Sequence, residues 1–315
     1  MVDPASIEAA AARIAGRVRI TPVIGLAPGD MGLPGRVSLK LESLQLSGSF
    51  KARGAYNRIL SSRVPAAGVI AASGGNHGAA VAWAAADLGH RAEVFVPTVA
   101  PPAKVARLRD FGAVVHVVGD RFVEAYDAMV ARAAETGATM IHPYDQAEVL
   151  AGQGTLAREF AAQVPDLDVV LVAVGGGGLI GGVSAWFGEA PGRRVRVVGV
   201  EPEACPSLHR ALAVGEPVDV AVGGIAVDSL GATRVGSLMF QVARRHVDRV
   251  VLVSDPAIRE AQVRAWSGLR IALEPGGAAA LAALTSGAFV PAVNERVGVV
   301  LCGGNVDPST LQETT

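Results

Sequence analysis

Short apolar runs rich in β-branched residues alternate along this chain with alanine-rich stretches of helical length. A continuous apolar run of about five residues is typical of a strand buried on both faces, and such strands need helices to cover them. The alternation therefore predicts an α/β protein with mostly parallel, twisted sheets flanked by helices. The expected strands are Val37–Leu41, Gly68–Ala72, Ala92–Pro97, Val114–Val118, Val169–Val174, Val195–Val200, Arg249–Val253 and Val297–Leu301. The expected helices between them include Gly78–Leu88, Val123–Thr136 and Leu179–Glu189.

Composition and charge exclude several classes of protein. Half of the 315 residues are hydrophobic, 18% are charged and the net charge is −1, which indicates a well-packed globular chain without a nucleic-acid-binding surface. Cys205 and Cys302 are far apart and no zinc-ligand spacing occurs. Residues 1–20 have no signal-peptide pattern, so we expect a reducing, cytoplasmic setting. The uncharged stretches 169–187 and 275–293 are interpreted as strand–loop–helix units and not as membrane spans.

One lysine stands out against the basic residues of the chain. Only Lys40, Lys51 and Lys104 are lysines among 28 basic residues, and all the others are arginines. Arginine stays protonated in proteins, whereas a lysine amine can lose its proton and attack a carbonyl. Lys51, in the run Ser47–Gly54, is therefore a candidate nucleophile or base.

Four consecutive glycines, Gly175–Gly178, follow a predicted strand and open a predicted helix. Free backbone amides at such a helix start bind anions, and glycine lets them approach closely. The same segment contains the G-x-G-x-x-G pattern at Gly176, Gly178 and Gly181, and Glu201 follows the next strand. This pattern is also typical of NAD-dependent oxidoreductases, so a dinucleotide site is an open alternative.

Two further glycine loops follow predicted strands. Residues 73–78 offer a second helix start able to bind an anion, and residues 302–305 place Cys302 after the last strand. Ligands of open parallel sheets bind outside the carboxyl ends of the strands, so Lys51 and the three loops are expected to meet in one crevice. A dinucleotide enzyme would explain only one of these loops.

These motifs together resemble a known family. The segments 40–55, 73–77, 151–155, 175–178, 199–202, 274–278 and 302–305 resemble, in the same order, those of pyridoxal-phosphate enzymes of the tryptophan-synthase-β fold. The similarity is greatest to the L-threonine/L-serine dehydratase branch and runs from about residue 15 to about residue 308.

The resemblance implies two domains with the cofactor, pyridoxal 5'-phosphate, in the cleft between them. Residues 1–52 with 148–315 would form the larger, cofactor-binding domain, and 53–147 the smaller, mobile one. The implied activity is β-elimination of L-threonine or L-serine to a 2-oxo acid and ammonia by a homodimer. Another β-hydroxyamino acid, such as 3-hydroxyaspartate, is the alternative substrate.

The resemblance also implies roles for individual residues. Lys51 would hold the cofactor as a Schiff base and take the Cα proton. The cofactor-binding residues would be Phe50, Lys51, Asn76, Gly175, Gly176, Gly177, Gly178, Leu179, Gly224, Glu274 and Cys302. The substrate carboxylate would be surrounded by Ser73, Gly74, Gly75, Asn76 and His77.

The chain departs from the family pattern in two places that matter for function. Serine racemases carry a serine where this chain has Gly74, so racemase activity is not expected. Relatives with a divalent metal site carry an aspartate where this chain has Ser207, six residues after Glu201. A monovalent cation near Glu201 is the remaining metal expectation.

Overall fold

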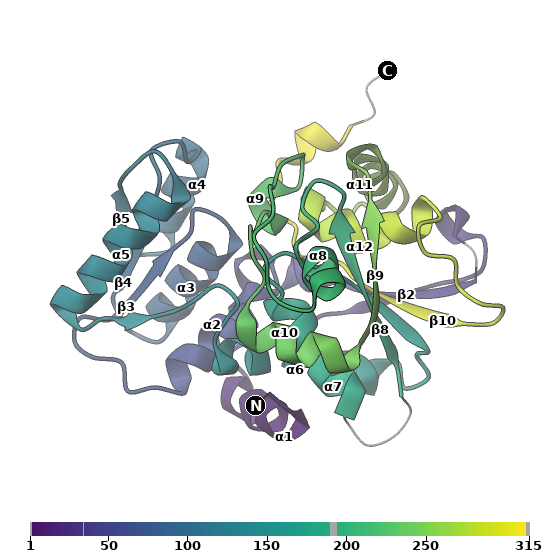
Figure 1. Cartoon of the computed structure of the whole chain (residues 1–315), viewed down its shortest axis with the longest axis horizontal. Helices are drawn as coiled ribbons and strands as arrows, with labels where there is room; N and C mark the ends of the chain where they lie inside the picture. Colours follow the sequence, from purple (N-terminus) through teal and green to yellow (C-terminus); the bar gives the residue numbers. More distant parts are fainter. Residues whose placement is uncertain (1, 34, 190–193, 313–315) are drawn as a thin grey trace.

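The computed structural model describes residues 2–33, 35–189 and 194–312, which form two separate β-sheets. The larger sheet has six strands in the order β1-β2-β10-β7-β8-β9, and the smaller has four in the order β5-β4-β3-β6 (Figure 1). All neighbouring strands are parallel except β1 and β2. The strands are β1 (Val23–Leu26), β2 (Arg36–Lys40), β3 (Val69–Ala72), β4 (Ala92–Val96), β5 (Val114–Val117), β6 (Thr139–Met140), β7 (Val169–Ala173), β8 (Arg196–Pro202), β9 (Val247–Val253) and β10 (Arg296–Val300).

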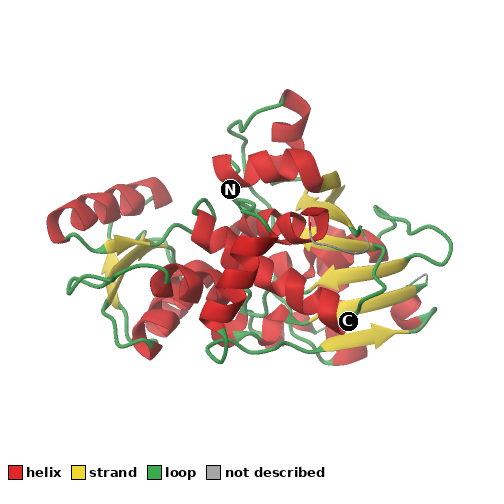
Figure 2. Cartoon of the chain, turned by 90° about the horizontal axis from the view of Figure 1, so that it is seen from below, coloured by secondary structure: helices red, strands yellow, loops and turns green. Residues whose placement is uncertain are grey.

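Helices flank both sheets (Figure 2). The α-helices are α1 (Pro4–Ile14), α2 (Lys51–Leu60), α3 (Asn76–Asp87), α4 (Pro102–Asp110), α5 (Phe122–Thr136), α6 (Ala147–Gln163), α7 (Gly178–Glu189), α8 (Ser207–Val214), α9 (Val227–Leu230), α10 (Ser237–His246), α11 (Asp255–Leu269) and α12 (Pro275–Thr285). Short 3-10 helices are η1 (Asp30–Gly32), η2 (Glu42–Leu44), η3 (Leu46–Gly48) and η4 (Pro308–Leu311).

The central strands β3 and β4 of the smaller sheet are buried on both faces, as their continuous apolar runs predict. Along β3, Val69 and Ala71 pack in one cluster with α3, whereas Ile70 and Ala72 pack in another with α5. Successive side chains of a strand point to opposite faces, so each face of β3 needs its own covering helix. The two helices therefore form the outer layers of this unit.

Helix α12 lies inside the larger unit and contacts β7, β8, β9 and β10. Every residue from Gly276 to Leu284 is buried. A helix that is apolar all round is stable in water only when neighbours enclose it, and here the sheet and α11 do so. The uncharged stretch 275–293 thus begins as a core helix. Within the described ranges, no helix is long and apolar enough to cross a bilayer.

The predicted α/β class with mostly parallel sheets is confirmed, and each predicted strand matches an observed strand to within two residues. Two strands were not predicted. β1 is a four-residue antiparallel edge strand, and β6 has only two residues.

The chain passes between the two units without a separate linker. All four strands of the smaller sheet lie within residues 69–140, inside the segment 53–147 predicted to form the smaller domain. The chain leaves the larger unit through α2 and returns through α6, and these helices pack against each other. Helix α2 also packs on α3, so it contacts both units. The division into two domains stays a prediction.

Candidate active site

A cavity of about 670 Å³ opens between the two sheets, where the loops after β3, β7 and β10 come together. Almost all of the predicted site residues line it. These are Phe50, Lys51, Ser73, Gly74, Gly75, Asn76, His77, Gly175, Gly176, Gly177, Gly178, Leu179, Glu274 and Cys302. The structure therefore brings Lys51 and the three glycine loops to one place, with the loops after β7 and β10 at the carboxyl edge of the larger sheet and the loop after β3 facing them from the smaller one.

Lys51 is the first residue of α2, and its position is fixed by the loop after β10. The Phe50 amide donates to the Cys302 carbonyl at 3.1 Å, and Ser49 forms a β-bridge with Gly303. The Lys51 amine lies 5.2 Å from the centre of the Phe50 ring and donates to the Pro143 carbonyl at 2.7 Å. Burial lowers the pKa of Lys51 to about 8 and outweighs the electrostatic effects of Cys302 and Glu274, which act in the opposite direction. The amine therefore loses its proton much closer to neutral pH than an exposed lysine does.

The tetraglycine loop presents backbone amides to the cavity between β7 and α7. Because α7 begins at Gly178, its first amides have no partner within the helix. In the part of the chain that the structure describes, the amides of residues 175–179 donate to no other backbone carbonyl. Gly177 has a φ of 94°, a conformation that side chains disfavour. This row of free donors at a helix N-terminus fits a phosphate group.

Close packing above the loop leaves no room for a side chain at Gly176, where a Cβ atom would lie 2.2 Å from the Tyr144 ring. We expect Gly176→Ala to displace the loop and weaken binding of pyridoxal phosphate by at least about tenfold, which corresponds to roughly 1.4 kcal/mol. Titration of cofactor-free protein followed by visible absorbance measures this. Gly25→Ala in β1, where a Cβ meets nothing within 4 Å, is the matched control. Equal affinity in the two variants would contradict the expectation.

A chain of amide hydrogen bonds connects the units beside the cavity. Asn76, the first residue of α3, donates through Nδ2 to Glu274 Oε1 at 2.5 Å and accepts from Asn305 Nδ2 at 2.6 Å. Glu274 is buried and precedes α12. Burial raises the pKa of Glu274 to about 7, although Asn76 and the cations Lys104 and Arg107 favour its charged form. The carboxyl can therefore carry a proton at neutral pH.

The raised pKa of Glu274 predicts a specific pH dependence of stability. A carboxyl whose pKa is higher in the folded than in the unfolded state stabilises the fold most at low pH, and this contribution is lost as the pH rises from about 4.5 through 7. In Glu274→Gln, the amide oxygen can still accept from Asn76. As the pH rises, the free energy of unfolding of this variant should therefore decrease by up to about 3 kcal/mol less than that of the wild type. Urea unfolding of cofactor-free protein at pH 5 and 7.5 tests this. Glu148→Gln, at an exposed carboxyl, is the control. Identical pH profiles for wild type and Glu274→Gln would refute it.

Cys302 follows β10 and lines the cavity as a buried, neutral thiol. Its sulfur donates to the Gly276 carbonyl at 3.4 Å, and burial raises the pKa of the thiol above its usual value. A neutral thiol is a weak hydrogen-bonding partner, as predicted for the residue that faces the cofactor nitrogen. That role stays a prediction.

The loop after β3 lies along the cavity, but His77 does not offer its ring N–H there. His77 Nε2 contacts the Ile141 carbonyl at 2.9 Å, so the ring proton lies on Nε2 and is already donated. Burial lowers the pKa of His77 to about 3, which keeps the ring neutral. A carboxylate would instead find donors in the first backbone amides of α3, which have no partner within the helix. Ser73 and Gly75 lie beside this helix start.

Two predicted residues lie outside the cavity lining. Gly224 turns with a φ of 75° beside the Asp255 carboxylate. Glu201 is fully buried, and its oxygens accept from the Ser207 hydroxyl and from the amides of Leu208 and His209. Glu201 is therefore not open to a ribose, which removes the acidic residue that the dinucleotide alternative requires. Within the described ranges no group of three metal-binding side chains occurs. The monovalent cation stays a prediction.

Sequence reasoning missed several residues of the cavity wall. His142, Pro143 and Tyr144 belong to the segment that connects β6 to α6, and Phe122 and Tyr126 come from α5. Because β6 is so short, no hydrophobic run indicated this return segment. Lys104 of α4 was also missed. Its ion pair with Asp228 of α9, at 2.9 Å, joins the two units at the cavity.

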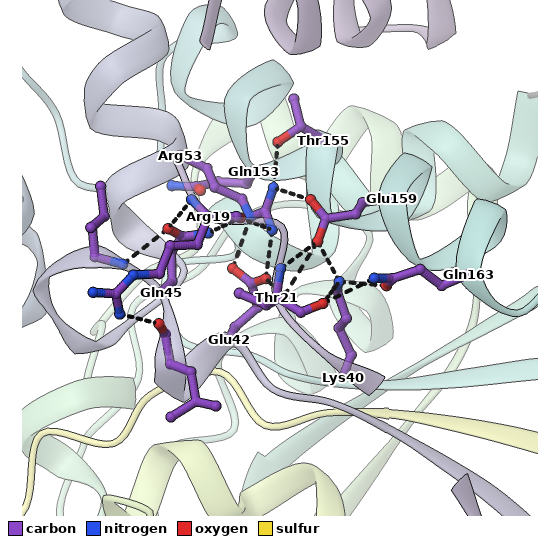
Figure 3. A network of polar contacts seen from close by, with 12 residues as sticks. Arg19, Thr21, Lys40, Glu42, Gln45, Arg53, Gln153, Thr155, Glu159 and Gln163 are labelled. Atoms are coloured by element: carbon purple, nitrogen blue, oxygen red, sulfur yellow. Dashed lines mark hydrogen bonds and ion pairs between the residues drawn. The ribbon is translucent and has the colours of Figure 1, made fainter. Parts of the chain in front are cut away.

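A network of buried charges surrounds Arg53 of α2 (Figure 3). The Arg53 guanidinium donates to both oxygens of Glu42, at 2.8 and 2.7 Å, and pairs with Glu159 of α6 at 3.0 Å. Lys40 of β2 pairs with the other Glu159 oxygen at 2.5 Å. Two cations thus balance two anions, and the arrangement is bidentate at Glu42, as arginine geometry allows.

Polar neighbours complete this network. The Lys40 amine also donates to the Thr21 carbonyl at 2.8 Å and to Gln163 at 2.7 Å, and the Thr21 hydroxyl donates to Glu42 at 2.6 Å. Buried charges are tolerated when they are paired and their remaining hydrogen bonds are satisfied. The network joins β2, η2, α2 and α6, and the first turn of α2 carries both Arg53 and Lys51.

These features define a site suited to hold a phosphate-bearing group next to a reactive amine between two α/β units. Comparison with known proteins agrees, since residues 14–303 match the family described as "Pyridoxal-phosphate dependent enzyme". The chain belongs to this family of pyridoxal-phosphate enzymes.

Several relatives are similar over nearly the whole chain. A phenylserine dehydratase of Ralstonia pickettii is 39% identical over 98% of this chain and 95% of its own length. An L-threonine ammonia-lyase of Thermotoga maritima is 38% identical over 88% of this chain and 69% of its own. Among solved structures, the threonine deaminase of T.th. matches with a TM-score of 0.90 and 36% identity, covering 97% of this chain and 99% of its own. Maize serine racemase matches with a TM-score of 0.91 and 34% identity, covering 98% and 95%.

Proposed function

We propose that this protein is an ammonia-lyase that eliminates water from L-threonine or L-serine and releases a 2-oxo acid and ammonia. The observation that carries the proposal is the position of the Lys51 amine in the same cavity as the free amides of residues 175–179. Threonine ammonia-lyases among the relatives support a dehydratase of this kind. In the described residues, Gly74 stands where serine racemases carry a serine, which favours elimination over racemisation.

The cavity residues suit the separate tasks of this reaction. Lys51 would hold the aldehyde of pyridoxal phosphate and the amides of the tetraglycine loop its phosphate. When bound, this cofactor supplies an electron sink for the pair left by a broken Cα–H bond. The amine of Lys51, with its lowered pKa, is suited to take the Cα proton. The first amides of α3 would bind the substrate carboxylate and orient Cα toward Lys51.

A second candidate substrate is an amino acid with a bulky aromatic group on its hydroxyl-bearing β-carbon. A side cavity of about 180 Å³ adjoins the main one and shares Ala72, Tyr126, His142 and Pro143 with it. Its wall adds Met129, Met140 and Ile141, so it is mainly apolar, with the polar residues Asp145 and Gln146 also in the lining. An apolar side cavity of this kind favours an apolar substituent. The phenylserine dehydratase among the relatives supports this candidate.

One assay distinguishes these possibilities. Purified protein loaded with pyridoxal phosphate is incubated separately with L-threonine, L-serine, phenylserine and 3-hydroxyaspartate, and ammonia and 2-oxo acid are measured. We expect release of both products in equal amounts from at least one of the first three. Chiral analysis of the remaining amino acid reports racemisation. If D-amino acid accumulates without ammonia, or if no compound reacts, the proposal is wrong.

A further inference from the structure

The His142 ring is held in a single tautomer by the backbone that follows it. Its Nδ1 atom accepts from the Tyr144 amide at 3.2 Å and from the Asp145 amide at 2.8 Å. A ring nitrogen that accepts hydrogen bonds carries no proton, so the proton of the neutral ring is on Nε2. His142 therefore presents an N–H donor on the side of the ring that faces away from these amides.

This donor is available at the cavity. Among the residues that the structure describes, none accepts a hydrogen bond from His142 Nε2, and the partly exposed ring lines both the main cavity and the side cavity. The next residue, Pro143, accepts the hydrogen bond from the Lys51 amine at 2.7 Å. The imidazole N–H and the reactive amine thus belong to adjoining parts of one wall.

The surroundings of the His142 ring favour its neutral form. Burial and the positive charge of Lys51 lower the pKa of His142, against the nearby Asp145 carboxylate. A neutral N–H donor suits an uncharged hydroxyl better than a carboxylate, which would favour the imidazolium. The carboxylate has its own donors at the start of α3. His142 lies instead at the junction with the side cavity, which offers space for a substituent on Cβ.

We propose that His142 Nε2–H donates a hydrogen bond to the β-hydroxyl oxygen of the substrate and orients the Cβ–O bond for departure. This assignment rests on the proposed dehydratase function and adds a specificity residue to it. The Cα–H and Cβ–O bonds break, and the proton removed by Lys51 joins the departing hydroxyl to form water. His142 keeps its own proton throughout, so the step requires no change in its protonation.

The test compares two leaving groups in the cofactor-loaded enzyme. His142→Ala should lower kcat/KM for the preferred hydroxyamino acid by about 10- to 100-fold, the range expected when a polar group loses its partner. Elimination of chloride from β-chloro-L-alanine, which needs no hydrogen-bond donor to depart, should change by less than about threefold by the same reasoning. His142→Gln, whose amide can still donate, should recover part of the loss.

Two controls separate this proposal from the function on which it rests. His209→Gln, at an exposed histidine, should leave both reactions unchanged. If His142→Ala slows both substrates equally, or neither, the assignment to the hydroxyl is wrong. If wild-type protein eliminates from neither substrate, the proposed function itself fails.

A second readout needs neither cofactor nor turnover. In protein labelled with ¹⁵N-histidine and free of cofactor, long-range ¹H–¹⁵N correlation spectra report the tautomer of each ring, and the spectrum of His142→Gln assigns the signal. We expect His142 to be neutral and protonated on Nε2 at pH 7. A ring protonated on Nδ1, or on both nitrogens, would overturn the proposal.

Discussion

A Lys51→Ala protein will fold and bind pyridoxal phosphate through its phosphate, but it will lose at least about 10⁵-fold in turnover. The size of this decrease in turnover follows from the loss of an oriented base, because such orientation lowers the activation free energy by roughly 7–11 kcal/mol. The fold should survive because the amine makes one hydrogen bond, to the Pro143 carbonyl, and because burial disfavours its charged form. Ammonia release, thermal unfolding and the visible absorbance of lysine-bound cofactor are measured together.

Lys51→Arg is the matched control for this experiment. It keeps a cation at the start of α2 but cannot react with an aldehyde or act as a base near neutral pH. We expect it to be as inactive as Lys51→Ala. Recovery of more than about one per cent of wild-type activity in either variant would mean that another group removes the proton, since such a loss is only about 2.7 kcal/mol.

The second large effect concerns the buried charges beneath α2. Arg53→Met should destabilise the fold by about 3–5 kcal/mol, because Glu42 would be left buried without its bidentate partner. Both side chains are almost completely excluded from water, at 1% and 0% exposure. Cofactor affinity should fall as well, since Arg53 and Lys51 share the first turn of α2. Urea unfolding and cofactor titration measure the two effects.

Two variants identify the cause of that loss. Arg158→Met, on α6, breaks an ion pair with Glu8 in which both side chains are about half exposed, so it should cost less than about 1 kcal/mol. The double variant Glu42→Leu/Arg53→Met removes both members of the buried pair. It should be less destabilised than the sum of the single variants, because neither charge is left alone. If the destabilisation of the double variant equals the sum of the two single variants, then side-chain packing, and not charge, causes most of the destabilisation.

Much of the fold could be predicted because its strands are buried on both faces and read as continuous apolar runs. β7 is an example, since all five of its residues are buried. The antiparallel strand β1 gave no such signal, because it is a four-residue edge strand with an exposed glycine at position 25. The strand β6 was too short to form a pattern.

The loops after β7 and β10 were predictable for a geometric reason, because both strands belong to one parallel sheet and their carboxyl ends lie at one edge. The loop after β3 belongs to the smaller sheet, so its position depends on how the two units face each other. The wall formed by His142, Pro143 and Tyr144 was not predictable, since it depends on where the returning chain lies against Lys51. The buried network of charges could not be predicted for the same reason, because it also depends on tertiary packing. Glu42, Arg53 and Glu159 lie on η2, α2 and α6, so only the packing of these separate elements brings them together, and no local pattern marks them as partners.

The order of strands in the larger sheet has a consequence for synthesis on the ribosome. The smaller sheet is complete once residue 140 has emerged, whereas β10, at 296–300, occupies the gap between β2 and β7. Until β10 has been translated, β2 and β7 each expose an unpaired edge, which is a template for aggregation. A nascent chain stopped before β10 would therefore carry a complete smaller unit joined to a larger unit whose sheet has two unpaired, aggregation-prone strand edges.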